Sequence, residues 1–168
     1  MENEKILISA CLLGEHVRYD GGTSTVSNPI LNRWDAEGRL VPICPEMAGG
    51  LSTPRPPAEI MGADTESVMR GINEVRTKQG DNVSSYFLDG AQQALTLAVE
   101  HDIQMAILKE GSPSCGSSQI NDGHFSGRKT AGQGITTALL RQNGIRVFSE
   151  KQISKAAKYL EKLEKGED

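Results

Sequence analysis

Short apolar runs recur along the chain, and the segments between them have the spacing of amphipathic helices. Four runs rich in β-branched and aliphatic residues predict buried strands. They lie at residues 6–8, 40–43, 103–108 and 145–148. The alternation of strands and helices is typical of a mostly parallel sheet with helices on both sides. We therefore predict an α/β fold, a Rossmann-like three-layer sandwich, formed by a single domain over residues 1–168.

Helix signals fill the gaps between these strands. Asn28 and Pro29 are suited to be the N-cap and the first residue of a helix that Gly38 ends. Ser149 and Gln152 resemble a capping box, which predicts a final helix. Apolar residues at helical spacing support the other helices. These later helices are expected at about 81–101, 132–142 and from 149 to about 163.

Three stretches do not fit this alternation. Residues 47–57 are rich in glycine and proline, and such a stiff stretch is more typical of a functional loop than of a flexible linker. Residues 58–78 contain short apolar segments separated by turn residues, which predicts a small antiparallel excursion. The strands of this excursion are expected at 59–61, 67–69 and 73–76. A further turn-rich loop is expected at 119–127.

Composition and charge exclude several classes of protein. The net charge of -4 and the isoelectric point near 5.4 give no excess of positive charge that would favour binding to nucleic acid or an anionic membrane. The apolar runs are too short to span a bilayer, and the first residues have no signal-peptide pattern. We therefore expect a cytoplasmic protein that binds neither nucleic acid nor membrane.

The three cysteines are the main candidates for chemistry. Cys11, Cys44 and Cys115 are far apart, and none belongs to a CxxC pair, so a disulfide framework is not indicated. Each follows the carboxyl end of a predicted strand, where open α/β proteins bind their ligands. Because neighbouring parallel strands are about 4.8 Å apart, cysteines that follow adjacent strands can share one inorganic centre.

The nature of that centre stays open at this point. An iron–sulfur cluster normally takes four cysteines, so three would leave one iron free for a substrate. Zinc bound by the cysteines and either His16 or His124 would be a closed structural site. A nucleophilic Cys115 activated by one of these histidines is another alternative. The remaining alternative is three buried thiols that only pack in the core.

A non-catalytic α/β module that binds a nucleotide or a metal is the main alternative to an enzyme. Its glycine-rich loops at the strand ends could hold a phosphate, with the cysteines as packing residues. However, the chain has neither a GxGxxG pattern after its first strand nor a Walker A pattern. A redox or iron–sulfur storage role is the other alternative. Three ligands with a carboxylate next to the site favour substrate chemistry over electron transfer.

Several blocks of small, acidic and proline residues surround the cysteines. The main blocks are SACLLG at 9–14, RYDG at 18–21, CPE at 44–46, GGL at 49–51, PRPPAE at 54–59 and SPSCG at 112–116. Shorter blocks are DG at 122–123, FSG at 125–127, GI at 144–145 and VFSE at 147–150. In combination they resemble the signature of the bacterial thiouracil desulfurase (desulfidase) family, over about residues 6–150.

The resemblance implies an oxygen-sensitive [4Fe-4S] cluster bound by Cys11, Cys44 and Cys115. It also implies an enzyme that removes sulfur from a small thiolated heterocycle such as 2-thiouracil, giving uracil and sulfide. The substrate's sulfur would bind the fourth iron. Val17 stands where some members of the family have a further cysteine, which supports three ligands rather than four.

Two further residues match catalytic positions of the family. Glu46 would take a proton from the attacking water and return one to the ring. Ser112 would position the water or bind the heterocycle, although from the residues alone it is a turn former before a proline. Arg55 would either bind a carbonyl or anionic ring or be an exposed side chain between prolines. No role is assigned to Glu59 or Asp20.

Overall fold

The computed structural model describes residues 3–166 of the chain. Its centre is a four-stranded sheet with the order β2-β1-β5-β8, and all three strand pairs are parallel. The strands are β1 (Ile6–Ser9), β2 (Leu40–Ile43), β5 (Met105–Leu108) and β8 (Arg146–Ser149). All four strands and the parallel α/β fold confirm the predictions. Pro42 is tolerated because β2 is an edge strand.

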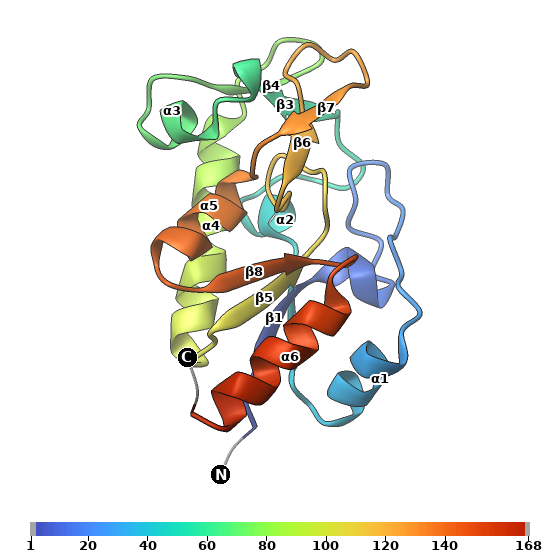
Figure 1. The fold of residues 1–168 in the computed structure, drawn as a ribbon. Coiled ribbons are helices and arrows are strands. Elements are labelled where there is room, and N and C mark those ends of the chain that lie inside the picture. The colour runs from blue at the N-terminus through green and yellow to red at the C-terminus, as the bar shows by residue number, and fades with distance from the viewer. Residues whose placement is uncertain (1–2, 167–168) are drawn as a thin grey trace.

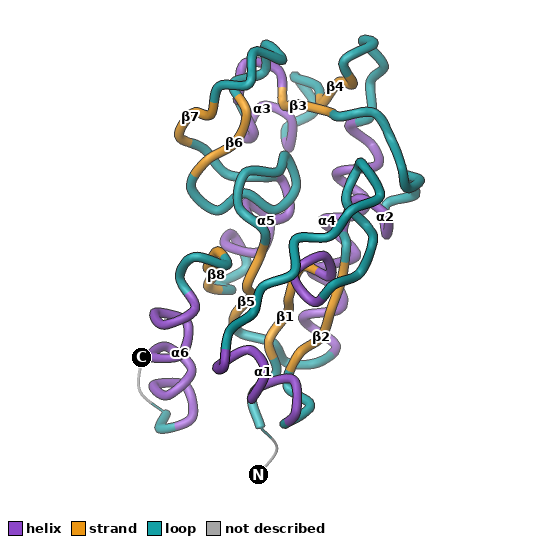
Figure 2. Tube along the Cα trace, turned by 90° about the vertical axis from the view of Figure 1, so that its right-hand side faces the viewer, coloured by secondary structure: helices purple, strands orange, loops and turns teal. Residues whose placement is uncertain are grey.

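Helices cover both faces of this sheet (Figures 1 and 2). One face packs against α1 (Pro29–Ala36) and α6 (Ile153–Glu164). The other face packs against α4 (Ser84–Glu100) and α5 (Ile135–Gln142). The three layers of the predicted sandwich are therefore present, with the sheet in the middle.

The two faces of β1 belong to separate parts of the hydrophobic core. Ile6 and Ile8 pack in a cluster with Trp34 of α1. Leu7 points to the opposite face and packs in a cluster with Ala94 of α4. Every residue of β1 is buried, which explains why its first three residues form a continuous apolar run and do not alternate with polar ones.

Side-chain caps define helix starts much as the sequence predicts. At the start of α1, the Asn28 Oδ1 accepts a hydrogen bond from the Ile30 N–H at 2.8 Å. Before α6, the Gln152 side chain accepts a hydrogen bond from the Ser149 N–H at 3.0 Å, as in a capping box. The helix itself begins at Ile153, later than the cap at Ser149 implies.

Two small antiparallel sheets lie together at one end of the molecule (Figure 1). One pairs β3 (Ala58–Ile60) with β4 (Val75–Thr77), which confirms the predicted antiparallel excursion. The other pairs β6 (Gln119–Asn121) with β7 (Lys129–Ala131). The sequence predicts only a turn-rich loop where this second hairpin begins.

The strand predicted at 67–69 is wrong. These residues belong to α3 (Thr65–Met69), which follows the short 3-10 helix η2 (Met61–Ala63). The Asp64 carboxylate accepts hydrogen bonds from the Ser67 N–H at 3.2 Å and from the Ser67 hydroxyl at 2.7 Å. This N-cap decides the outcome, because a short apolar run fits a strand and a helix equally well.

Two short elements directly follow the first two strands of the large sheet. They are η1 (Ala10–Leu13), a 3-10 helix after β1, and α2 (Pro45–Ala48), a helical turn after β2. The sequence predicts loops at both places. Within residues 3–166, no helix combines the length and the apolar character needed to cross a membrane.

Candidate active site

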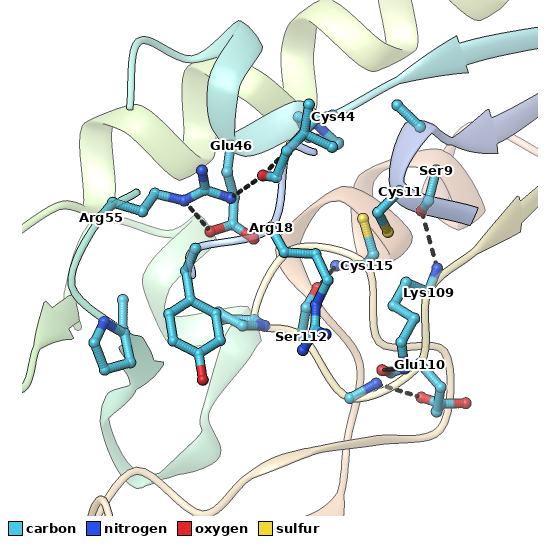
Figure 3. Close-up of a pocket in the computed structure, with 18 of the residues that line it drawn as sticks. Ser9, Cys11, Arg18, Cys44, Glu46, Arg55, Lys109, Glu110, Ser112 and Cys115 are labelled. Atoms are coloured by element: carbon cyan, nitrogen blue, oxygen red, sulfur yellow. Dashed lines mark hydrogen bonds and ion pairs between the residues drawn. The ribbon is translucent and has the colours of Figure 1, made fainter. Parts of the chain in front are cut away.

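A pocket with a volume of about 300 Å³ opens at the carboxyl edge of the parallel sheet (Figure 3). Its walls come from η1, from α2 and from the loops that follow η1, α2 and β5. Its polar and thiol side chains belong to Ser9, Cys11, Arg18, Tyr19, Cys44, Glu46, Arg55, Lys109, Glu110, Ser112, Cys115, Asn121 and Lys129. The five site residues that the sequence singles out therefore line one cavity.

Each cysteine reaches the pocket from the end of a different strand. Cys11 lies in η1 after β1, Cys44 is the N-cap residue of α2 after β2, and Cys115 lies in the loop after β5. Because β1 lies between β2 and β5, Cys11 comes from the middle strand. All three are free thiols, and Figure 3 shows them entering from separate segments.

Burial governs the protonation of these thiols. It raises the pKa of Cys11 to about 11, and the nearby Cys44 adds to that shift. Burial also raises the pKa of Cys115 to about 12 and raises the pKa of Cys44. The free thiols are therefore neutral at pH 7, and a metal centre that binds them must displace their protons.

The arrangement of the thiols discriminates between the centres that the sequence leaves open. Among residues 3–166, no three His, Cys, Asp or Glu side chains are placed to hold a single metal ion. His16 and His124 are exposed and do not line the pocket, so neither completes a zinc site or activates Cys115. A cluster has several iron atoms, so three thiols that line one pocket could each bind a different iron of it.

Two side chains hold the loop that carries Cys115. The Ser112 Oγ accepts a hydrogen bond from the Cys115 N–H at 2.7 Å, and its own hydroxyl hydrogen is left to donate. Glu110 accepts from the N–H groups of Ser117, Ser118 and Gln119 at 2.8, 3.0 and 3.1 Å, and from both serine hydroxyls. Burial opposes ionisation of Glu110, but these bonds lower its pKa to about 2.

Glu46 and Arg55 form an ion pair on another wall of the pocket (Figure 3). The Arg55 Nε lies 3.2 Å from the Glu46 Oε1, and the two side chains are only 4% and 16% exposed. Burial raises the pKa of Glu46, and Arg55 offsets part of that rise. Pro45, the first residue of α2, fixes the backbone from which Glu46 projects.

Arg55 is buried, so the expectation of an exposed side chain between prolines is wrong. Its Nη1 donates to the Ser52 carbonyl at 3.0 Å and to the Thr53 hydroxyl at 2.9 Å. Its Nη2 donates to the Val17 carbonyl at 2.8 Å. With the bond to Glu46, four of the five N–H groups are used within the protein, and Arg55 positions Glu46.

The two carboxylates without an assigned role stabilise turns. The Glu59 Oε1 accepts hydrogen bonds from the Gly123 N–H at 2.9 Å and the Phe125 N–H at 3.2 Å, which ties β3 to the loop between β6 and β7. The Asp20 Oδ1 accepts from the Gly22 N–H at 2.8 Å, as in an Asx turn. Glu59 and Asp20 do not line the pocket.

Positive side chains at the pocket are the main feature that sequence reasoning missed. The Lys109 Nζ lies 3.2 Å from the Glu150 Oε2, and the Lys129 Nζ donates to the Gly111 carbonyl at 3.3 Å. Burial and the nearby Lys109 lower the pKa of Lys129. Lys109 directly follows β5, which is the one sequence signal that could have identified it, whereas no pattern marks Lys129.

Comparison with known proteins agrees with this geometry. A family model described as 2-thiouracil desulfurase matches residues 6–152. The chain belongs to this 2-thiouracil desulfurase family. An uncharacterized family relative, YbbK of Bacillus subtilis (strain 168), is 44% identical over 149 residues, which cover 89% of this chain and 97% of YbbK.

A solved structure of the family also matches over nearly the whole chain. It is a [4Fe-4S]-dependent thiouracil desulfidase, TudS, with 49% sequence identity and a TM-score of 0.87. The match covers 95% of this chain and 99% of TudS. The family resemblance that the cysteine blocks predict is therefore confirmed, and with it the α/β fold.

Proposed function

We propose that this chain is a [4Fe-4S]-dependent thiouracil desulfidase that converts 2-thiouracil to uracil and sulfide. The observation that carries the proposal is that Cys11, Cys44 and Cys115 line one pocket from the ends of three strands. Membership of the 2-thiouracil desulfurase family and the 49% identity to TudS support it. These three thiols would hold the cluster.

The chain has three cysteines, so it offers one ligand fewer than a [4Fe-4S] cluster usually takes. When bound, such a cluster supplies an iron without a protein thiolate, a Lewis acid that can take the sulfur of the substrate. The pocket volume of about 300 Å³ suits small molecules. Three free thiols and such a cluster also suit a reducing cytoplasm.

Glu46 is proposed to move the protons of the reaction. Its carboxylate lines the cavity that the three cysteines share, while Arg55 and Pro45 restrict where it can lie. From this place it can take a proton from an attacking water and later deliver one to the ring. A positioned acid–base group of this kind typically contributes about 10²–10⁴-fold in rate.

Ser112 is proposed to bind the heterocycle or the attacking water. Its oxygen accepts from the Cys115 N–H, so its orientation is fixed by the loop that holds a cluster ligand. The hydroxyl hydrogen remains available to donate to a group in the pocket. Ser112 would thus place the reacting atoms relative to Cys115.

The proposal is tested by incubating protein that was reconstituted without oxygen with 2-thiouracil. We expect the wild type to form uracil and sulfide in equal amounts. Glu46→Gln should keep the cluster but turn over about 10²–10⁴-fold more slowly, because it cannot transfer the proton. Glu66→Gln is the matched control, since Glu66 occupies the first turn of α3 as Glu46 does in α2.

Two results would contradict the proposal. A wild type that carries the full cluster yet leaves 2-thiouracil unchanged removes the assigned reaction. A Glu46→Gln variant with the activity of Glu66→Gln removes the proton-transfer role of Glu46 and leaves the reaction itself in place.

A further inference from the structure

Tyr19 lies at the pocket with a partly exposed side chain. It belongs to the loop between η1 and α1 and lines the cavity. The residue is 42% exposed although it borders the pocket. Within residues 3–166, its hydroxyl makes no hydrogen bond to the protein, and its ring packs on no other aromatic ring.

The backbone that carries this free side chain is held firmly. The Tyr19 carbonyl accepts a hydrogen bond from the Arg55 N–H at 2.7 Å, and the Arg18 carbonyl accepts from the Gly21 N–H at 2.8 Å. Two residues earlier, the Val17 carbonyl accepts from the Arg55 Nη2 at 2.8 Å. The backbone from which the ring projects is therefore fixed, so a ligand that contacts the ring needs to order the side chain but not the loop.

The other described residues of the cavity walls offer no aromatic ring. Among the described residues that line the pocket, Tyr19 is the only aromatic one, and the rest are thiols, small residues, prolines, the aliphatic Val17 and Ile43, and charged or polar side chains. Aliphatic side chains and the Arg18 guanidinium can also cover the face of a planar heterocycle, but Tyr19 offers the one aromatic face among these described residues. An aromatic side chain can stack on such a face whatever substituents the ring carries.

We propose that Tyr19 stacks on the face of the heterocycle and makes the pocket selective for planar over puckered rings. This inference rests on the proposed function, because it takes a pyrimidine as the ligand. Tyr19 is then a specificity residue that acts on binding, while Glu46 and Ser112 act on the reacting atoms.

The test compares Tyr19→Ala, Tyr19→Leu and Tyr19→Phe with Tyr86→Ala. Tyr86 is a matched control, because it is also 42% exposed but lies on α4 and does not line the pocket. The measurements are the KM and kcat for 2-thiouracil, the iron content, and the inhibition constants of uracil and 5,6-dihydrouracil. Dihydrouracil has the same polar edge as uracil but a puckered, non-aromatic ring.

Loss of the stacking face should raise the KM of Tyr19→Ala about 5- to 150-fold and leave kcat and iron content close to wild type. The preference for uracil over dihydrouracil should shrink in Tyr19→Ala and Tyr19→Leu. Tyr19→Phe keeps the ring and should keep both the KM and the preference, and Tyr86→Ala should match the wild type.

The inference is overturned if Tyr19→Ala and Tyr19→Leu discriminate uracil from dihydrouracil as well as Tyr86→Ala does. It is also overturned if both variants lose iron, since Tyr19 would then be needed for the cluster and not for the ring. An active wild type with either result leaves the proposed function intact. A fully loaded but inactive wild type instead overturns the proposed function, and the inference with it.

Discussion

At the scale of single residues, Glu110 has the largest set of interactions near the site. Its two carboxylate oxygens accept from three successive backbone N–H groups and two hydroxyls, all from residues 117–119. These bonds close the Cys115 loop on itself, because Glu110 precedes the cysteine and its donors follow it. The loop should therefore depend on the charge of one side chain.

Glu110→Gln tests this dependence. The lowered pKa means that the wild type gains stability from ionised Glu110 above about pH 4.5 and loses it as the pH falls toward about 2. The variant should be about 1–3 kcal/mol less stable at pH 7, and this difference should shrink between pH 5 and pH 3. Urea unfolding at several pH values measures it.

Glu161→Gln is the control for that experiment, because Glu161 is exposed on α6. Its free energy of unfolding should follow the wild type across the same pH range. A Glu110→Gln protein whose stability tracks the wild type at pH 7 and at pH 3 would contradict the assigned role of Glu110.

The sequence predicts those site residues whose signal is local. Cys11 and Cys44 lie within two residues of the end of a strand, so an apolar run is enough to locate them at the sheet edge. The role of Arg55 was not predictable in this way, because its bond to the Val17 carbonyl joins positions 38 residues apart. Tyr19 belongs to the RYDG block at 18–21, but its place at the pocket was not predictable, since it depends on how a long loop folds back.

At the scale of elements, close contact between α2 and α4 positions Cys44 and Glu46. A Cβ atom on Gly90 would lie 1.9 Å from the Pro45 carbonyl oxygen, which is far closer than any real contact. Only glycine at this position of α4 allows α2 to approach so closely. The helical turn that carries Glu46 is therefore held by its contact with α4 as well as through its own backbone.

Gly90→Ala should separate these two helices. Overpacking against a backbone atom should lower the free energy of unfolding by about 1–3 kcal/mol, despite the better helix propensity of alanine. Because Cys44 is the N-cap residue of α2, iron bound after reconstitution should fall as well. Thermal unfolding and iron analysis measure the two effects.

Gln92→Ala provides the control on the same helix, because Gln92 is exposed and its substitution should change stability by less than about 0.5 kcal/mol. A Gly90→Ala protein that is as stable as Gln92→Ala and binds as much iron would show that the close approach is not required.

The elements themselves were predictable where their signals were strong. Continuous apolar runs predict all four strands of the large sheet, and Asn28 predicts the start of α1. The sequence fails at α3, where a short apolar run reads as a strand, and at β6 and β7, which form a hairpin among turn residues. In each case long-range packing or a local cap outweighs a weak pattern.

At the scale of the whole molecule, the order of the strands brings the site together. The sequence predicts that the cysteines lie at one edge of a parallel sheet, but it cannot predict that β1 lies between β2 and β5. This order makes the three cysteine-bearing strands immediate neighbours. The two small sheets contribute Ala58, Asn121 and Lys129 to the lining of the pocket.

The central claim is that Cys11, Cys44 and Cys115 together hold one [4Fe-4S] cluster, and analysis of bound metal tests it most directly. Iron and acid-labile sulfide are measured per chain after reconstitution without oxygen, for the wild type and for each single Cys→Ser variant. The account predicts about four of each in the wild type and a loss of most of both in all three variants. A wild type without an iron–sulfur cluster, or a Cys44→Ser protein that keeps the full complement, would contradict it.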